Sequence, residues 1–536
     1  MLATARASGK LPRRLRVLTR CAMKTILAAL ALALLPAAAA NAAATDAPAP
    51  LAETETGRVR GTIANGVETF RGIPFAAPPV AGNRWRAPQP AARWRGVRDA
   101  TRFGADCMQK PFESDAAPLG TAPAEDCLFV NVWRPAGTKP GAKLPIVAWI
   151  YGGGFVNGGA SPAVYDGSAF ARAGVIFVSF NYRLGRFGFF AHPALAAEGR
   201  IANWGLLDQQ AALRWLQRNA TRFGGDPAAV TVVGESAGGR SVLALLGAPA
   251  AKGLFARAVI MSGGGRTLLD AAPDTASRAA TAFAAKQGIA GSDAGALARL
   301  RALPPERVID DLNLATLGEA SATFAGAAPD GVTVSGTAEE MLRAGRQTRV
   351  PVMVGATSAD IGWLPADSKE ALFAHFGAQA AAARAAYDPD GTAALPTLSA
   401  AIGSDRQMVE PARFVARRVS AAGVPAYVHR FSYVADSKRG AWKGAPHATD
   451  IPYFFDTVAA KYGPDLTPQD AAVARAINAY VVGFAKTGVP GGTGLPTWPA
   501  LSGKGPLMDF AATGKPVVGQ DPWQARLDVT EAVADR

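Results

Sequence analysis

The feature that most constrains the fold is a glycine-rich turn between a strand pattern and a helix pattern. The apolar residues 230–233 predict a short buried strand, and a helix pattern begins at residue 237. Between them stands Gly234-Glu235-Ser236-Ala237-Gly238, which matches G-x-S-x-G. With 58 glycines in 536 residues the match alone says little. Its place between a strand and a helix predicts a tight turn that presents Ser236, with glycines where a Cβ would collide with the neighbouring backbone.

Strand and helix patterns alternate along most of the chain. Apolar β-branched runs predict strands at residues 144–150 and 175–180, and further strands are expected at 230–233, 256–261, 350–354 and 426–431. Amphipathic or Ala-rich segments predict helices at residues 207–219, 237–246, 280–287 and 469–486. This alternation predicts an α/β fold whose mostly parallel central sheet has helices on both faces and long insertions. Residues 365–425, Ala-rich and helical, are expected to form one insertion and part of a lid or pocket wall.

The first 42 residues have the layout of a secretory signal peptide. Seven basic side chains and no acidic one precede an apolar run at residues 26–35, and Ala40-Asn41-Ala42 forms a small-x-small cleavage pattern. Met23 is an alternative start. Residues 43–52 are expected to be a flexible lead-in and residues 53–536 a single domain. We therefore expect export to the periplasm or the medium, without stable membrane insertion after cleavage.

Charge and cysteine content argue against several classes of protein. The net charge is +14, or +7 once the seven basic residues of the leader are removed, and no run of five Lys or Arg follows, so nucleic-acid binding is not expected. Export permits a disulfide between Cys107 and Cys127, and two buried free thiols are the alternative. The few cysteines and four histidines have no zinc-site spacing, so neither a metal nor a cofactor is expected.

A serine hydroxyl is a poor nucleophile without a nearby base. Of the four histidines, His447 lies in a loop beyond the last predicted strand, where sheets of this kind place functional side chains; the others are His192, His375 and His429. The α/β-hydrolase fold has the chain order serine, acid, histidine. Asp360, shortly after the strand at 350–354, is the preferred acid, and Asp330, in a Pro-Asp-Gly turn, is its competitor.

Such a serine also needs amide donors for an oxyanion. One donor is the N–H of Ala237, directly after Ser236. The others are expected in Tyr151-Gly152-Gly153-Gly154-Phe155, which follows the strand at residues 144–150. A flexible loop without function is the alternative interpretation of these glycines.

A series of ordered motifs resembles the type-B carboxylesterase family, which includes cholinesterases, bile-salt-activated lipases and many bacterial esterases. The resemblance runs from about Gly57 to Phe510. Its motifs are Phe70-Arg71-Gly72-Ile73-Pro74-Phe75-Ala76, Arg84-Trp85, Trp94-Arg95-Gly96, Glu125-Asp126-Cys127-Leu128-Phe129-Val130-Asn131-Val132, Asn181-Tyr182-Arg183, Asn203-Trp204-Gly205-Leu206-Leu207-Asp208-Gln209 and Phe223-Gly224-Gly225-Asp226-Pro227.

The resemblance implies an α/β-hydrolase that cleaves small-molecule carboxylic esters through a Ser-His-Asp triad and an acyl-enzyme. The site residues that it implies are Ser236 as nucleophile, His447 as base, Asp360 at the acid position, Gly153, Gly154 and Ala237 as oxyanion donors, and a Cys107–Cys127 disulfide. A catalytically silent binding protein of the same family and an amidase or peptidase of the same fold are the alternatives. Acyl preference, alcohol preference and oligomeric state are not predicted.

Three positions depart from the family pattern. Tyr151 replaces the usual His before the glycines, and Asp360 replaces the usual Glu and is followed by Ile361 before Gly362. Asp450 stands where the family often has Glu. We expect Asp450, Glu235 and Tyr151 to support the site without reacting, and helix capping is the alternative role of Asp450.

Overall fold

The computed structural model describes residues 49–199, 202–266, 272–331 and 333–535. The predicted leader and most of the predicted lead-in lie outside these residues. Leu51 and Ala52, predicted to belong to the flexible lead-in, instead form strand β1 (Leu51–Glu53). This strand pairs with β2 (Arg58–Arg60), which pairs with β5 (Val97–Asp99) in a small three-stranded sheet. The lead-in is therefore shorter than predicted.

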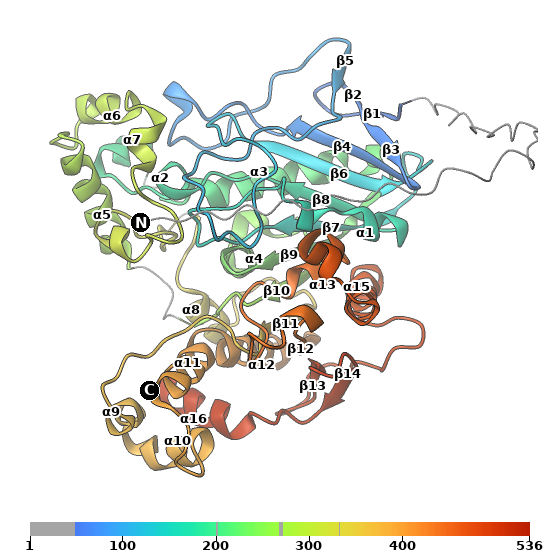
Figure 1. The fold of residues 1–536 in the computed structure, drawn as a ribbon. Helices are drawn as coiled ribbons and strands as arrows, with labels where there is room; N and C mark the ends of the chain where they lie inside the picture. Colours follow the sequence, from blue (N-terminus) through green and yellow to red (C-terminus); the bar gives the residue numbers. More distant parts are fainter. Residues whose placement is uncertain (1–48, 200–201, 267–271, 332, 536) are drawn as a thin grey trace, which may run out of the picture. The chain divides into compact units, whose positions relative to one another are not determined.

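The main sheet has eleven strands in the order β14-β13-β12-β11-β10-β9-β7-β8-β6-β4-β3 (Figure 1). From β8 to β13 every neighbouring pair is parallel, whereas β6, β4 and β3 at one edge and β14 at the other pair antiparallel. The bounds are β3 (Thr62–Ala64), β4 (Val67–Pro74), β6 (Phe129–Pro135), β7 (Leu144–Ile150), β8 (Ile176–Phe180), β9 (Gly225–Glu235), β10 (Arg257–Met261), β11 (Val352–Thr357), β12 (Ala426–Phe431), β13 (Leu507–Phe510) and β14 (Pro516–Gly519). The predicted mostly parallel sheet is confirmed.

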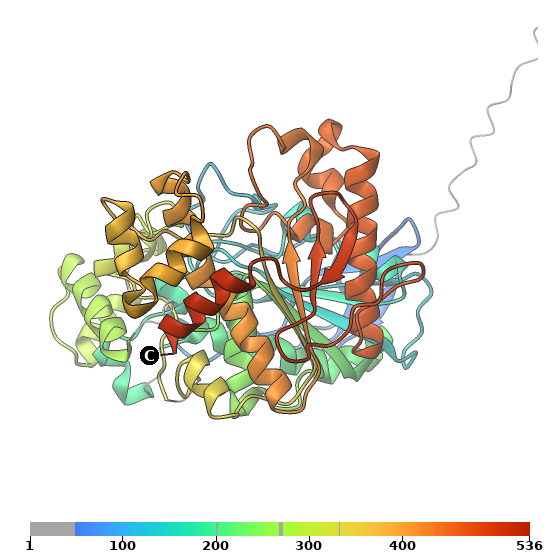
Figure 2. The ribbon, with the colours of Figure 1, turned by 90° about the horizontal axis from the view of Figure 1, so that it is seen from below.

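Helices cover both faces of this sheet, which is why its central strands are continuously apolar. On one face α4 (Ala237–Gly247) and α12 (Glu410–Ala421) contact strands β9 to β12, and α8 (Ala338–Arg343) contacts both helices. On the other, α1 (Ser168–Arg172) and α15 (Pro468–Thr487) contact each other and strands among β6 to β9. Figure 2 shows α12 and α15 on opposite sides of the C-terminal strands. The remaining helices near the sheet are α2 (Gly185–Gly188), α3 (Trp204–Asn219), α13 (Ile451–Phe454) and α14 (Val458–Tyr462).

Two groups of helices have apolar clusters of their own. The first comprises α5 (Pro273–Lys286), α6 (Ala294–Arg301) and α7 (Pro305–Ile309), which lie together in Figure 1. Their apolar residues, among them Phe283, Leu300 and Val308, form a cluster that also includes Phe187 of α2 and Trp204 of α3. The second comprises α9 (Lys369–Ala374), α10 (Ala380–Tyr387), α11 (Leu395–Ser404) and the C-terminal α16 (Gln524–Ala534). None of the helices that the structure describes combines the length and apolar character needed to span a bilayer.

The predicted insertion at residues 365–425 is helical, but it divides into two parts. Helices α9 to α11 form the second helix group, whereas α12 packs on β11 and β12 and belongs to the layer that covers the sheet. Within this stretch Met408 is the residue that lines the largest cavity described below. Residues of the segment 314–327, among them Leu314, Leu317 and Phe324, line this cavity instead.

Candidate active site

Ser236 occupies the turn between β9, which ends at Glu235, and α4, which begins at Ala237. Its φ of 55° lies in a region that is costly for a residue with a Cβ. Two backbone hydrogen bonds hold this conformation: Ser236 N–H donates to Met261 O of β10 and Arg240 N–H donates to Ser236 O, each at 2.9 Å. The strand–serine–helix turn predicted from the sequence is confirmed.

The flanking glycines are required by close backbone approach. A Cβ on Gly234 would collide with the carbonyl group of Gly238, and a Cβ on Gly238 would collide with the carbonyl oxygen of Ile150 in β7. A Cβ on Gly152 would lie 2.9 Å from the Cβ of Ser236. The turn is therefore packed against the loop that follows β7, and a larger residue at these positions would separate the two.

His447 and Asp360 are in direct contact. The ring Nδ1 of His447 lies 2.6 Å from Asp360 Oδ1. Asp360 Oδ2 accepts hydrogen bonds from Ser262 Oγ at 2.6 Å and from Thr357 N–H at 2.9 Å. Burial acts to raise the pKa of Asp360, but the attraction of His447 and these donors outweighs it and leaves the pKa below its ordinary value. The carboxylate is therefore ionised and oriented towards the imidazole.

The loops that carry these two side chains are joined by hydrogen bonds. Ala359 N–H donates to Ala445 O, and Ala445 N–H donates to Ser358 Oγ, both at 2.9 Å. Ala359 and Pro446 also form an isolated parallel bridge. The loops approach closely enough for the aspartate, which is one methylene shorter than glutamate, to reach the imidazole.

Two more carboxyl groups surround the imidazole. His447 Nε2 lies 3.2 Å from Oε1 of Glu235, the residue before Ser236. Burial raises the pKa of Glu235 to about 8 and that of Asp450 to about 7. Burial acts to lower the pKa of His447, but Glu235 and Asp360 outweigh it and raise this pKa to about 10. The site thus holds three acidic groups around one base.

Asp450 does not cap a helix with its side chain. Its carbonyl accepts from Tyr453 and Phe454 N–H at the start of α13, but no side-chain cap is formed. Neither carboxyl oxygen has a hydrogen-bond partner among the residues that the structure describes. The structure thus gives no side-chain cap for the capping role, and the support of the site by Asp450 stays a prediction.

The glycine loop after β7 faces the same cavity as Ser236. Gly153 and Gly154 have φ values of 99° and 63°, and they line the cavity together with Ser236, Ala237 and His447. The cavity has a volume of about 620 Å³. The structure therefore brings the predicted nucleophile, base and amide donors to one space.

Tyr151, the residue before the glycine loop, packs against Tyr182. Its ring stacks on that of Tyr182, with centroids 4.5 Å apart. Tyr151 Oη donates to Tyr182 O at 3.2 Å, and Tyr182 Oη donates to Tyr151 O at 2.8 Å. Burial raises the pKa of Tyr151 well above its ordinary value, so the phenol is neutral. The reciprocal pair therefore fixes the backbone of Tyr151 at the start of the glycine loop.

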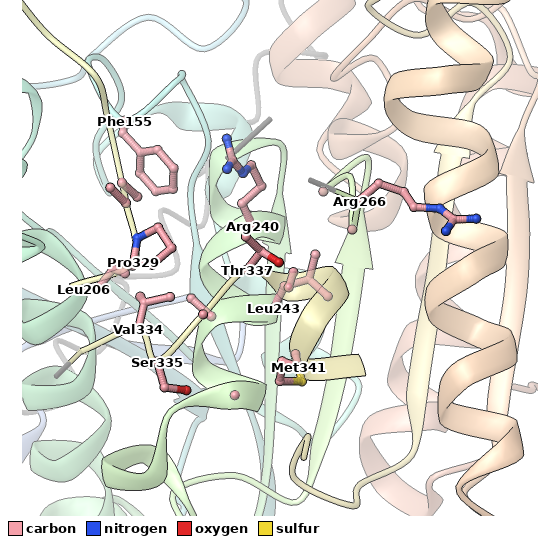
Figure 3. Close-up of a pocket in the computed structure, with 18 residues that line it drawn as sticks. Phe155, Leu206, Arg240, Leu243, Arg266, Pro329, Val334, Ser335, Thr337 and Met341 are labelled. Atoms are coloured by element: carbon pink, nitrogen blue, oxygen red, sulfur yellow. The ribbon is translucent and has the colours of Figure 1, made fainter. Parts of the chain in front are cut away.

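The cavity wall is largely apolar. Leu314, Leu317 and Phe324 contribute to one side, and the charged side chains among the lining residues are Asp115, Glu235, Arg240, His447 and Lys461. Phe155 and Arg240 also line a second cavity of about 60 Å³, where Leu206 and Pro329 face them (Figure 3). Arg266 borders this second cavity, but its guanidinium is bound to Glu410 of α12 and points away (Figure 3).

The other candidates have structural roles. Asp330 was the competing candidate for the triad acid, with a turn as the simpler explanation of this residue. Its carboxylate accepts from Thr333 and Val334 N–H, at 2.6 and 3.0 Å, as expected of a turn residue. His192 accepts from Ala194 N–H, and His429 is in the core, where burial lowers its pKa to about 3. His375 lines a different cavity.

Cys107 and Cys127 form a disulfide, so the alternative of two free thiols is wrong. Among the described residues no group of three or more His, Cys, Asp and Glu side chains is arranged to hold a metal ion.

Sequence reasoning missed four side chains that contact this site: Ser262, Tyr182, Gln109 and Asn157. Ser262 donates to Asp360 across 98 residues of chain, and no local pattern connects the two. Tyr182 lies in the Asn181-Tyr182-Arg183 motif, which the sequence analysis identified, but its hydrogen bond to the carbonyl of Tyr151 was not predicted.

Comparisons with known proteins show the family of the chain. A sequence model described as the carboxylesterase family matches residues 48–526. The chain is 33% identical over 496 residues to a fumonisin B1 esterase from Sphingopyxis macrogoltabida, with 88% of each chain covered. It is 35% identical over 463 residues to a para-nitrobenzyl esterase from Bacillus subtilis, with 83% of this chain and 91% of that one covered.

Solved structures give the same result. A para-nitrobenzyl esterase structure superposes with a TM-score of 0.78 at 31% identity, covering 90% of this chain and 99% of that one. A carboxylesterase from Geobacillus stearothermophilus has a TM-score of 0.76 at 32% identity, with 89% of this chain and 99% of the other covered.

Proposed function

The chain belongs to the carboxylesterase family and is a carboxylic ester hydrolase, and from this premise we propose that Ser236, His447 and Asp360 are its catalytic triad. The observation that carries the proposal is the 2.6 Å contact of His447 Nδ1 with a buried, ionised Asp360, while His447 and Ser236 line one cavity. Asp360 holds the tautomer in which Nδ1 is protonated and Nε2 is free to accept a proton. The Nε2 atom lies 3.2 Å from Oε1 of Glu235, the last residue of β9 and the one before Ser236.

In the proposed reaction, His447 Nε2 takes the proton of Ser236 as Oγ attacks the ester carbonyl carbon. The tetrahedral oxyanion is bound by the amides of Gly153, Gly154 and Ala237. His447 then gives its proton to the departing alcohol, which leaves Ser236 acylated. Water repeats the sequence on the acyl-enzyme and releases the acid. The position of the two glycines supports this role, because they have positive φ values and directly follow Gly152, where a Cβ would lie 2.9 Å from the Cβ of Ser236.

Replacement of the nucleophile tests the proposal. Ser236→Ala is expected to lower kcat for a short-chain aryl ester by at least about 10⁴-fold and to abolish labelling by a fluorophosphonate probe. Ser420→Ala is the matched control, because this serine lies on α12, donates to Leu501 O and does not line the cavity. Thermal unfolding of both variants checks that the fold is intact. If Ser236→Ala kept most of the activity, the assignment would be refuted.

The substrates are proposed to be esters with an apolar acyl group, because Leu314, Leu317 and Phe324 form one side of the cavity. Rates across p-nitrophenyl esters from acetate to palmitate measure how long an acyl chain the cavity accepts. Matched ester and amide substrates decide whether amides are also cleaved. A rate that is independent of the acyl group would argue against this wall as the acyl site.

The protein is also proposed to be exported. The residues before position 43 have a signal-peptide layout, and the Cys107–Cys127 disulfide is typical of proteins outside the cytoplasm. N-terminal sequencing of the protein expressed from its full chain in a bacterium is expected to give a mature form beginning after Ala42, outside the cytoplasm. An active cytoplasmic protein that retains its N-terminus would contradict this.

A further inference from the structure

Asn157 lies where three segments of the chain meet. Its side chain is only 2% exposed, so its amide group depends on protein partners. Asn157 Nδ2 donates to Gln109 Oε1 at 3.1 Å and to Lys110 O at 2.9 Å. Asn157 Oδ1 accepts from Leu314 N–H at 2.7 Å. One side chain thus joins the glycine loop, the disulfide loop and the cavity wall.

Gln109, two residues after Cys107 of the disulfide, binds the backbone next to Asn157. Its Oε1 accepts from Gly158 N–H at 2.9 Å, and its Nε2 donates to Gly158 O at 2.6 Å. Nε2 also donates to the carbonyl of Cys107 at 2.9 Å, two residues earlier in the chain. Gln109 therefore clamps the backbone directly after Asn157 to a segment that the disulfide fixes.

The glycine loop closes on Asn157. Gly153 O accepts hydrogen bonds from Val156 N–H at 3.0 Å and Asn157 N–H at 2.9 Å. The backbones of Gly153 and Asn157 are so close that a Cβ on Gly153 would collide with Asn157 O. A displacement of Asn157 would therefore displace Gly153.

Leu314 and Leu317 of the cavity wall pack against Gly154. A Cβ on Gly154 would lie 2.8 Å from Leu314 Cδ1 and 3.3 Å from Leu317 Cδ2. Leu314 is 40% exposed and lines the cavity together with Leu317. Asn157 therefore accepts a hydrogen bond from Leu314, which packs on Gly154 and also lines the cavity.

We propose that Asn157 is a positioning residue that fixes the glycine loop and the wall at Leu314 and Leu317 as one unit, so that the wall sets the placement of the oxyanion donors. This inference rests on the proposed function, in which Gly153 and Gly154 bind the oxyanion. An oxyanion hole stabilises the transition state only if its amides are held in place before the reaction. A small displacement of the loop should therefore lower kcat while leaving the binding of the ground-state ester nearly unchanged.

Asn157→Ala tests the proposal, with Asn219→Ala as the matched control. Asn219 is also a buried asparagine that joins two segments, since it accepts from Glu55 N–H and donates to Trp215 O, but it does not line the cavity. We expect Asn157→Ala to lower kcat for p-nitrophenyl acetate, measured per titrated active site, by about tenfold or more, with KM changed by less than about twofold. The control is expected to keep the wild-type kcat.

A transition-state analogue gives a second measurement that a merely structural role would not affect. A trifluoromethyl ketone forms a hemiketal with the serine, and its oxyanion occupies the hole, whereas the matching methyl ketone binds without this charge. The ratio of their inhibition constants is expected to change in Asn157→Ala in proportion to kcat. An unchanged ratio, or a loss of activity explained wholly by fewer titratable sites, would overturn the proposal.

Leu314→Ala is a second test, which can be used if Asn157→Ala does not fold. Leu314 is partly exposed, and its truncation leaves the hydrogen bond of its backbone N–H in place. The loss of its contact with Gly154 is expected to change the same inhibitor ratio by several-fold. An unchanged ratio would show that the wall does not act on the hole. If the wild-type enzyme neither hydrolyses the ester nor reacts with a fluorophosphonate, the proposed function fails; if it does both and these variants behave like wild type, only this inference fails.

Discussion

Removal of the negative charge of Glu235 should move the pH–rate profile to lower pH. Glu235 Oε1 lies 3.2 Å from His447 Nε2, the atom that is proposed to accept the serine proton. An anion beside an imidazole favours its protonated form and raises its pKa. In Glu235→Gln this contribution is absent, so the pKa of His447 falls and the unprotonated base is present at lower pH. The acidic limb of kcat/KM therefore shifts downward.

The distance sets an upper limit on this shift. Two unit charges 3.2 Å apart interact by about 5 kcal/mol at an effective dielectric constant of about 20, which corresponds to a change of about four in pKa. The observed change should be smaller, because burial raises the pKa of Glu235 to about 8 and the two groups compete for one proton near neutral pH. A molecule with Glu235 ionised and His447 protonated has no free base. A downward shift of at least about one pH unit is expected.

The assay measures kcat/KM for a p-nitrophenyl ester from pH 5 to 10, read at the isosbestic wavelength of the product. The wild-type limb is expected above pH 6.5, the ordinary pKa of histidine, because the surrounding carboxylates raise the pKa of His447. Asp450→Asn should shift the limb in the same direction by less, since Glu235 has the larger effect on His447. Asp465→Asn, at an exposed position, is the control. A limb that stays in place or moves to higher pH in Glu235→Gln would refute the reasoning.

Two further predictions concern the acid and the disulfide. Asp360→Asn should lower kcat by about 10⁴-fold without unfolding the protein, because the amide favours the tautomer of His447 that carries its proton on Nε2. Steady-state kinetics at neutral pH measure this loss. A loss below tenfold would exclude Asp360 as the triad acid. Replacing Cys107 and Cys127 together by serine should lower the free energy of unfolding by about 3 kcal/mol, the chain-entropy value for a bridge spanning 20 residues, and urea unfolding with and without the bridge measures it.

The parts of the fold that the sequence predicted are those with local causes. Strand β7 was predicted with the bounds that the structure has, because it is a continuous apolar run that helices bury. Strand β12 also has the predicted bounds, although it contains His429 and Arg430. The nucleophile turn was predicted because its glycines and its flanking elements are adjacent in the chain. The strand at 230–233 was predicted too short, since β9 begins at Gly225 and its residues 226–229 are partly buried or exposed, so they lack the apolar pattern.

The parts that the sequence did not predict depend on contacts between distant residues. Asn157 and Leu314 are 157 residues apart, and the wall that contains Leu314 has no pattern that distinguishes it from an ordinary loop. The more apolar and helical residues 365–425 were the more plausible wall, but α9 to α11 find partners in each other and in α16. An apolar helix face in the sequence predicts that the helix is packed, but it does not identify the element on which the helix packs.

The site brings together several arrangements that are each unfavourable to the fold. Ser236 has a positive φ, Glu235 is fully buried beside the nucleophile, and Asp450 is buried with no hydrogen-bond partner among the described residues. Strain of this kind costs of order 1–3 kcal/mol for each backbone outlier, and an unpaired buried polar group costs a similar amount. The backbone hydrogen bonds of Ser236 and the attraction of His447 for Glu235 offset part of these costs, and the packing of the large parallel sheet on which the turn is built must offset the rest. A site that needs a strained serine and several acids around one base therefore requires a scaffold whose stability comes from elsewhere.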